Sequence, residues 1–131
     1  MNEQELFYVL ALQKVELVGD IVAKKLINHI GNAQDVFKAK PSQLSSIDGV
    51  GSILINNLKN EQVFKMAEAE LKFITQNNID TTFFKDDNYP EKLKHCIDGP
   101  VLLFASGNIN LANRKIISIV GTRQITPQGT E

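Results

Sequence analysis

The chain has 131 residues, of which 43% are hydrophobic and 22% charged, proportions typical of a folded globular protein and not of a disordered one. Its formal net charge is -1, with eight basic against nine acidic residues up to residue 78 and six against six beyond it. This balance excludes a strongly basic nucleic-acid-binding domain, so any contact with nucleic acid must be local.

Cysteine usage and the N-terminal residues indicate the compartment. Cys96 is the only cysteine, which excludes an internal disulfide framework and fits a reducing environment. The first 20 residues carry acids where a signal peptide needs bases, and no run is apolar enough to span a membrane. We expect a cytoplasmic protein with no membrane partner.

The first 78 residues show helical periodicity. Their apolar positions recur three and four residues apart, Gly31-Asn32 is a glycine-type stop, and Pro41 suits the first turn of a helix. We predict helices over residues 3–13, 19–30, 33–40, 41–47, 50–58 and 63–74.

The composition changes near residue 78. Short β-branched and aromatic runs bounded by turn residues predict strands at 81–84, 101–105 and 115–120. Between the first two strands, Tyr89-Pro90 predicts a rigid turn into a single helical turn, with a cis peptide bond as the alternative. The predicted fold class is α+β, with an all-α domain at 1–78 and a second domain at 79–131.

The helical part contains a repeat. Residues 15–27 align with residues 47–59 at an offset of 32, with identities at Val18/Val50, Gly19/Gly51, Ile21/Ile53 and Leu26/Leu58. Such a repeat indicates two copies of one helix-turn-helix unit, neither of which can bury its apolar face alone.

The second copy begins its helix with Ile47-Asp48-Gly49-Val50-Gly51-Ser52 and resembles the helix-hairpin-helix motif, whose free amides hold a DNA phosphate without reading a base. The resemblance implies a tandem helix-hairpin-helix domain and phosphate contacts from Gly49, Gly51, Ser52 and Lys59. The first copy departs from the motif, because Leu17 replaces its first glycine and Asp20 places a negative charge in the phosphate pocket. Two interpretations stay open: both hairpins are structural joints, which the charge balance favours, or the second contacts DNA.

The most specific pattern lies at 89–129. Tyr89-Pro90 is followed by a Gly-Pro turn, an apolar strand, a second apolar strand running into Val-Gly-Thr-Arg at 120–123, and Thr-Pro-Gln-Gly at 126–129. This order resembles the beginning of the DNA-processing protein A family (DprA, also called Smf), and the helical part is similar to the N-terminal domain of many members.

The resemblance implies a cytoplasmic bacterial protein that binds single-stranded DNA taken up during natural transformation, protects it, and loads the RecA recombinase onto it. It implies an extended Rossmann-like domain used without a dinucleotide. The residues themselves offer no carboxylate pair, no nucleophile with a base and no phosphate loop with lysine, so we expect neither enzymatic activity nor a cofactor. The family's phosphate-contacting signature maps onto Gly121, Thr122, Arg123 and Thr126. Further glycine-rich loops of such a domain do not follow, so we expect the chain to be the first part of a longer protein.

Two rival functions remain. A nucleotide-binding Rossmann enzyme would also place a glycine after a strand, but the next glycine after Gly121 is Gly129, so the dinucleotide fingerprint is missing. A helical protein-interaction adaptor without DNA binding fits the charge balance. Binding of DNA by the helical part would separate the last interpretation from the family one.

Other chemically active residues suggest no catalytic or metal site. His29 is expected near a helix end, His95-Cys96 lacks the second ligand pair of a zinc site, and Cys96 is interpreted as a small buried apolar residue. The strand predicted at 115–120 is apolar on both faces and has few partners in the chain. We therefore expect self-association through its open edge.

Overall fold

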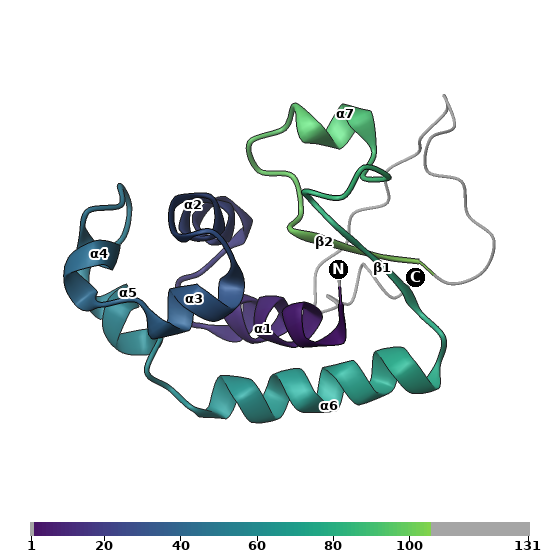
Figure 1. The fold of residues 1–131 in the computed structure, drawn as a ribbon, viewed down its shortest axis with the longest axis horizontal. Helices are drawn as coiled ribbons and strands as arrows, with labels where there is room; N and C mark the ends of the chain where they lie inside the picture. Colours follow the sequence, from purple (N-terminus) through teal and green to yellow (C-terminus); the bar gives the residue numbers. More distant parts are fainter. Residues whose placement is uncertain (1, 106–131) are drawn as a thin grey trace, which may run out of the picture.

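The computed structural model of the chain describes residues 2–105 (Figure 1). Within this range the elements follow in the order α1 (Glu3–Lys14), α2 (Asp20–Ile30), α3 (Ala33–Lys38), α4 (Pro41–Ser45), α5 (Ser52–Asn57), α6 (Gln62–Gln76), β1 (Asp80–Phe83), α7 (Glu91–Lys94) and β2 (Leu102–Ala105).

The helix ends follow from the local sequence. Asn2 caps α1, because its side-chain oxygen accepts a hydrogen bond from the Glu5 amide at 2.8 Å. At the end of α2, Gly31 has a φ of 126°, and its N–H donates to the Ile27 carbonyl. Pro41 occupies the first turn of α4, as expected, since proline has no N–H to satisfy there.

The core lies between the helices. Helix α1 packs against α6, α3 and α2, with Leu10 and Leu12 of α1 and Leu26 of α2 each 0% exposed. Full burial of a leucine side chain contributes about 1.5–3 kcal/mol. A cluster of aromatic rings joins α1, α3 and α6, with ring centroids 5.0 to 6.3 Å apart, and consists of Phe7, Tyr8, Phe37 and Phe64. The first helix is therefore the centre of the bundle.

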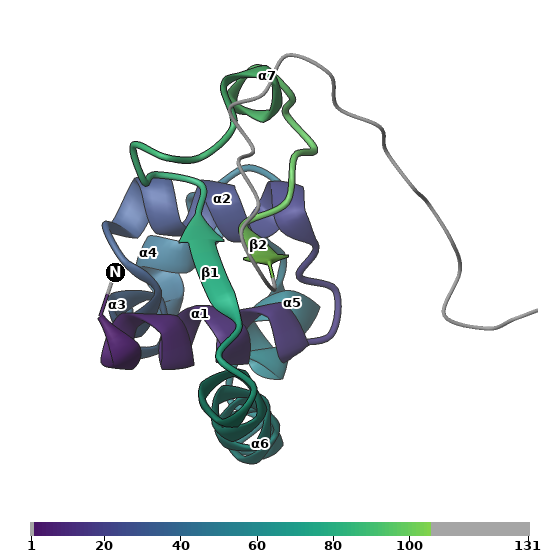
Figure 2. The same ribbon diagram turned by 90° about the vertical axis from the view of Figure 1, so that its right-hand side faces the viewer.

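The two strands form an antiparallel ladder that lies against the helices. Asp80 pairs with Ala105 and Phe83 with Leu102. Figure 2 shows β1 and β2 in front of α1 and α2, with α6 below α1 on the side opposite α2. Val101 and Leu102 are 0% and 4% exposed and belong to the same apolar cluster as the helical core. The boundary predicted at residue 78 therefore separates two segments that share one core.

Most predicted elements are confirmed. The six helices before residue 78 are all present, several with shorter ends, and the strands at 81–84 and 101–105 are β1 and β2. Pro90 caps α7 as the predicted rigid turn, and the peptide bonds of residues 2–105 include no cis bond. The fold is α+β, rich in helix with one small sheet.

Two further predictions concern the third strand and the membrane. The strand predicted at 115–120, and with it the self-association expected through its edge, lies outside the described residues. Over residues 2–105, no helix is both long and apolar enough to cross a membrane.

Candidate nucleic-acid interface

The two copies of the sequence repeat fold into equivalent loops. Leu17 has a φ of 75° and Gly49, its counterpart 32 residues on, has a φ of 87°. The next residues, Val18 and Val50, are buried at 8% and 7% exposure. Their amides donate to the carbonyls three residues earlier, both at 3.1 Å. Leucine therefore adopts the left-handed conformation that glycine takes in the second copy, so its presence does not change the path of the first loop.

The sequence places the Asp20 carboxylate in a phosphate pocket, but the structure gives it another role. Asp20 is the first residue of α2, and its Oδ1 accepts a hydrogen bond from the Val101 amide at 3.1 Å. Because Val101 is completely buried, this acceptor satisfies an amide that would otherwise lack a partner. The Asp20 carboxylate thus holds the residue that enters β2, and it places a negative charge at the start of α2, where a phosphate would otherwise bind.

The second loop is open. Gly49, Gly51 and Ser52 are exposed, and a Cβ added to Gly51 would meet no atom within 4 Å. Gly51 has an ordinary φ of -103°, so the conformationally demanding glycine of the pair is Gly49. The structure brings these three predicted residues together on one loop that caps α5.

The predicted cation of this loop is not beside it. Lys59 is exposed but follows the C-terminal end of α5, at the opposite end of that helix from Gly51. Lys25 of α2 lies closer, because its Nζ is 3.9 Å from the position of a Cβ on Gly49 and 3.9 Å from Asp48 Oδ2. A repeat alignment cannot identify this lysine, since it comes from the other copy.

Tyr89 fixes the turn before α7. The side chain is 3% exposed, and its hydroxyl donates to the Pro100 carbonyl at 2.7 Å. Burial raises the pKa of Tyr89, and the electrostatic effects of Asp20 and Cys96 raise it further, so the hydroxyl keeps its proton and its donor role. A Cβ on Gly99 would approach the Leu93 carbonyl to 2.9 Å, so only glycine fits beside this ring.

The interpretation of Cys96 as a buried residue is wrong. Cys96 follows the end of α7 on the solvent side and is exposed, with its Sγ donating to the Lys92 carbonyl at 3.6 Å. The neighbouring His95 caps the C-terminal end of α7 and lies 3.7 Å from Glu91, the first residue of that helix. Among residues 2–105, no group of three His, Cys, Asp or Glu side chains could hold a metal ion.

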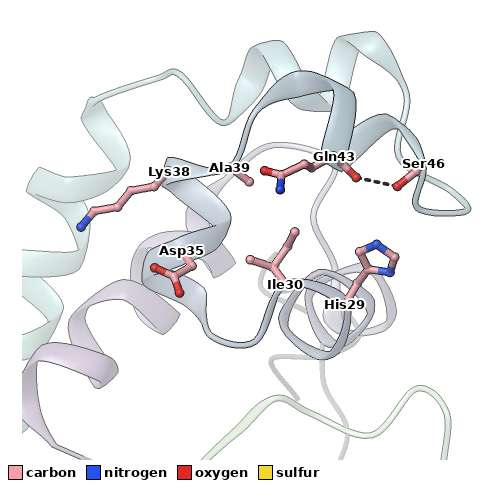
Figure 3. Close-up of a pocket in the computed structure, with 7 residues that line it drawn as sticks. All are labelled: His29, Ile30, Asp35, Lys38, Ala39, Gln43 and Ser46. Carbon is pink, nitrogen blue, oxygen red and sulfur yellow. Dashed lines mark hydrogen bonds between the residues drawn. The ribbon is translucent and has the colours of Figure 1, made fainter.

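A shallow hollow beside α2, α3 and α4 holds the other histidine. Figure 3 shows its lining residues, which are His29, Ile30, Asp35, Lys38, Ala39, Gln43 and Ser46. The Ser46 hydroxyl donates to the Gln43 carbonyl at 2.7 Å, and the Asp35 carboxylate accepts from the side-chain amide of Asn32 at 3.0 Å. The serine and the carboxylate are thus occupied by local hydrogen bonds, and His29 lies in the last turn of α2 as the sequence predicts.

Gly121, Thr122, Arg123 and Thr126, which carry the family signature, lie outside the described residues. Comparison with known proteins tests the resemblance itself. Residues 80–131 match the protein family described as DNA recombination-mediator protein A. The resemblance to the DprA/Smf family is confirmed.

Relatives bearing both names of the DprA/Smf family match the chain. Protein Smf of Synechocystis sp. is 27% identical over 138 residues, which cover 99% of this chain and 34% of that protein. The DNA processing protein DprA of Streptococcus pneumoniae is 41% identical over 46 residues, covering 35% of this chain and 16% of its own length. The chain therefore spans about a third of Smf and less of DprA.

A DNA ligase of Corynebacterium urealyticum is 34% identical over 59 residues, which cover 45% of this chain and 8% of the ligase. The match covers less than half of this chain and a small part of the ligase. No solved structure matches the chain.

Proposed function

We propose that the chain is the N-terminal part of a recombination mediator that binds single-stranded DNA, protects it during natural transformation, and loads the RecA recombinase onto it. The match of residues 80–131 to the DNA recombination-mediator family carries this proposal. The role in DNA processing rests on the family, and the single-stranded ligand and the RecA partner follow the resemblance. DNA protection and RecA loading are both non-enzymatic, since they require only binding and positioning.

The phosphate-binding loop of this function is Gly121, Thr122, Arg123 and Thr126. A glycine after an apolar strand lets the backbone approach an anion, two hydroxyls can donate to it, and the arginine guanidinium matches two phosphate oxygens at once. These contacts go to the DNA backbone, so the proposed binding does not depend on base sequence.

Replacing Arg123 with alanine in the whole chain tests the loop. A charged donor on a phosphate contributes about 1.5–3 kcal/mol, so Arg123→Ala should weaken binding of a labelled oligothymidylate about tenfold or more. The slope of log affinity against log salt should fall by about 0.7. Fluorescence anisotropy titrations at several NaCl concentrations measure both quantities.

Arg114→Ala is the matched control, because Arg114 is the other arginine of the chain and lies outside the signature. Equal losses in the two variants would show that only total charge matters, and would remove Arg123 from the site.

For the second loop we propose a structural joint first and a DNA contact from Gly49, Gly51, Ser52 and Lys59 second. Gly51→Glu distinguishes them, because the open space at Gly51 accepts the side chain and its carboxylate would repel a phosphate. Gly19→Glu on the first loop is the control, since Gly19 has equally open space. A joint predicts that neither variant changes oligothymidylate affinity, whereas a contact predicts loss in Gly51→Glu alone.

A helical adaptor that binds protein is the second candidate function. Met66 and Phe73 of α6 are 48% and 59% exposed and lie seven residues apart, which places them on one outward face of the helix. Exposed apolar pairs of this kind suit a protein contact. Met66→Gln/Phe73→Gln should leave DNA binding intact and abolish pull-down of purified RecA if this face is the contact.

A further inference from the structure

A cleft separates α2 from the segment that surrounds α7. Its volume is about 400 Å³, within the range of ligand pockets in proteins. Residues of α2 form one wall and residues 84–97 the other, and the lining consists of Ile21, Lys24, Lys25, Asn28, Phe84, Lys85, Tyr89, Leu93, Lys94, Cys96 and Ile97. Figure 1 shows α7 above α2 on the side of the molecule away from α6.

The lining of the cleft carries positive charge in a protein that is nearly neutral. Four of its lining residues are lysines and none is a carboxylate. Among the described residues, no carboxylate oxygen lies within 4.0 Å of the ammonium of Lys24 or Lys85. The four lysines therefore give the lining a positive charge, although acids such as Asp86, Asp87 and Asp98 flank it in sequence and the chain as a whole has a net charge of -1.

The other two lysines have only weak partners. Lys25 is 3.9 Å from Asp48, whose side chain is fully exposed, and Lys94 is 3.5 Å from Glu91, which is 76% exposed. Ion pairs this exposed are worth little, because water and salt screen them. An anion in the cleft can replace either carboxylate at low cost.

Lys24 holds the two walls together. Its ammonium donates to the carbonyls of Cys96 and Ile97, at 3.4 and 3.2 Å, and lies 5.9 Å from the centre of the Phe84 ring. Lys85 approaches the same ring at 5.8 Å. Phe84 thus lies near two ammonium groups, so a ligand that reaches the cations has an aromatic surface beside it.

The cleft edge carries exposed apolar surface beside the cations. Ile97 is 75% exposed and Ile21 38% exposed, and both line the cleft. The aspartate and glutamate side chains of an acidic protein would contact only the lysine ammonium groups and would leave the apolar surface unused. An unpaired nucleotide would use both kinds of surface, with its phosphate on lysine and its base on the apolar side chains, and a duplex would offer no free base face.

We propose that this cleft is a second binding site for the backbone of single-stranded DNA, in which Lys85, Lys94 and Lys25 contact phosphates and Phe84 and Ile97 contact a base. Lys24 is a positioning residue that holds the loop after α7. The inference takes its ligand from the proposed function, but none of its residues belongs to the 121–126 loop.

The test uses the whole chain and the variant Lys85→Gln/Lys94→Gln, with anisotropy titrations of a labelled oligothymidylate. The control is Lys65→Gln/Lys72→Gln on α6, away from the cleft. Each double variant removes two charges and one exposed pair with a glutamate of the same helix, because Lys72 lies 3.8 Å from Glu68. Thermal melting of each variant checks that the fold is retained.

We expect the cleft variant to bind oligothymidylate about tenfold more weakly than the control and to lose about 1.4 from the salt slope, for two phosphate contacts on a single strand. In the unaltered chain, the amide NMR signals of residues 84–97 should shift on addition of oligothymidylate, while those of α6 stay in place. Duplex DNA of the same length should compete poorly.

Several outcomes overturn the proposal. Equal weakening in both double variants, or no weakening in either, removes the cleft, and so does a polyglutamate peptide that competes as well as oligothymidylate. Arg123→Ala, measured in parallel, separates the two sites. If only Arg123→Ala weakens binding, the cleft proposal fails and the 121–126 loop is retained as the DNA site. If only Lys85→Gln/Lys94→Gln weakens binding, the 121–126 loop is excluded and the cleft is retained. A chain that does not bind oligothymidylate overturns both.

Discussion

The two loops of the repeat have the same backbone and different partners. Leu17 and Gly49 share a left-handed conformation, Val18 and Val50 are both buried, and a glycine precedes the helix in each. The next position differs: Asp20 of the first copy holds the Val101 amide, whereas Ser52 of the second copy is exposed. The backbone path of a repeat can thus persist while the first residue of the helix decides whether that helix start holds another segment of the chain.

The two loops also contact each other. The Asn57 side chain, on α5 of the second copy, donates to the Glu16 carbonyl in the first loop at 2.9 Å. Lys25 of the first copy reaches back to Asp48 of the second. The two loops of the repeat are therefore joined to each other.

The largest effect is expected where the loops differ most. Asp20→Ala leaves the buried Val101 amide without an acceptor, which should lower the free energy of unfolding by about 1–3 kcal/mol. Ser52→Ala, at the equivalent position, should change it by less than about 0.5 kcal/mol. Asp20→Asn keeps the acceptor oxygen and should fall between them. Urea denaturation measures all three, and equal losses at positions 20 and 52 would mean that the loops do not differ.

A middle-sized effect concerns the left-handed residues. Gly49→Ala forces a Cβ into this conformation and should cost about 1–2 kcal/mol. Leu17→Gly relieves the same strain but gives the unfolded chain more freedom, which offsets about 0.5–1 kcal/mol of the gain. We expect a small stabilisation from Leu17→Gly, because the leucine side chain is 63% exposed and loses little burial. A clear destabilisation in urea would show that Leu17 makes a packing contact that its exposure hides.

The smallest effect concerns the Tyr89 hydroxyl, which donates to the residue before Val101. Tyr89→Phe removes the hydrogen bond to Pro100 and should cost about 0.5–1.5 kcal/mol at neutral pH. The pKa of Tyr89 is raised above 10.0 in the folded state, so its stabilising contribution is complete below pH 10 and is lost as pH rises through the folded value.

The difference in unfolding free energy between the two proteins should therefore shrink above pH 10. Urea denaturation from neutral pH to pH 11 measures it, with tyrosinate absorbance reporting the ionisation. A difference that stays constant with pH would place the Tyr89 hydroxyl in a solvated environment instead of a buried one.

The sequence predicts the features of this fold that depend on residues close to one another in the sequence. Helical spacing locates α1 to α6, the glycine at Gly31 ends α2, and the offset of 32 aligns Leu17 with Gly49. The helical period and the caps can be predicted because they depend on residues only a few positions apart in the sequence, and the repeat because its two copies have similar sequences.

Contacts between distant residues cannot be predicted in the same way. Asp20 and its partner Val101 are 81 residues apart, so the charge of Asp20 suggests a poor phosphate pocket and says nothing about β2. The cleft joins lysines of α2 to lysines near α7, and neither pair is a basic run by itself. The exposure of Cys96 likewise depends on which side of the turn after α7 meets solvent.

Residues Asp20 and Lys24 stand one turn apart on α2 and together hold both ends of the segment 96–101, through the carbonyls of Cys96 and Ile97 and the amide of Val101. This double attachment limits how freely the helical part can be exchanged as a module. A chimera that replaced residues 1–78 with another bundle would expose Val101, leave its amide unpaired and release the loop after α7. Gene fusions and domain swaps in this protein therefore need the acid and the lysine of α2 to accompany the strand they hold.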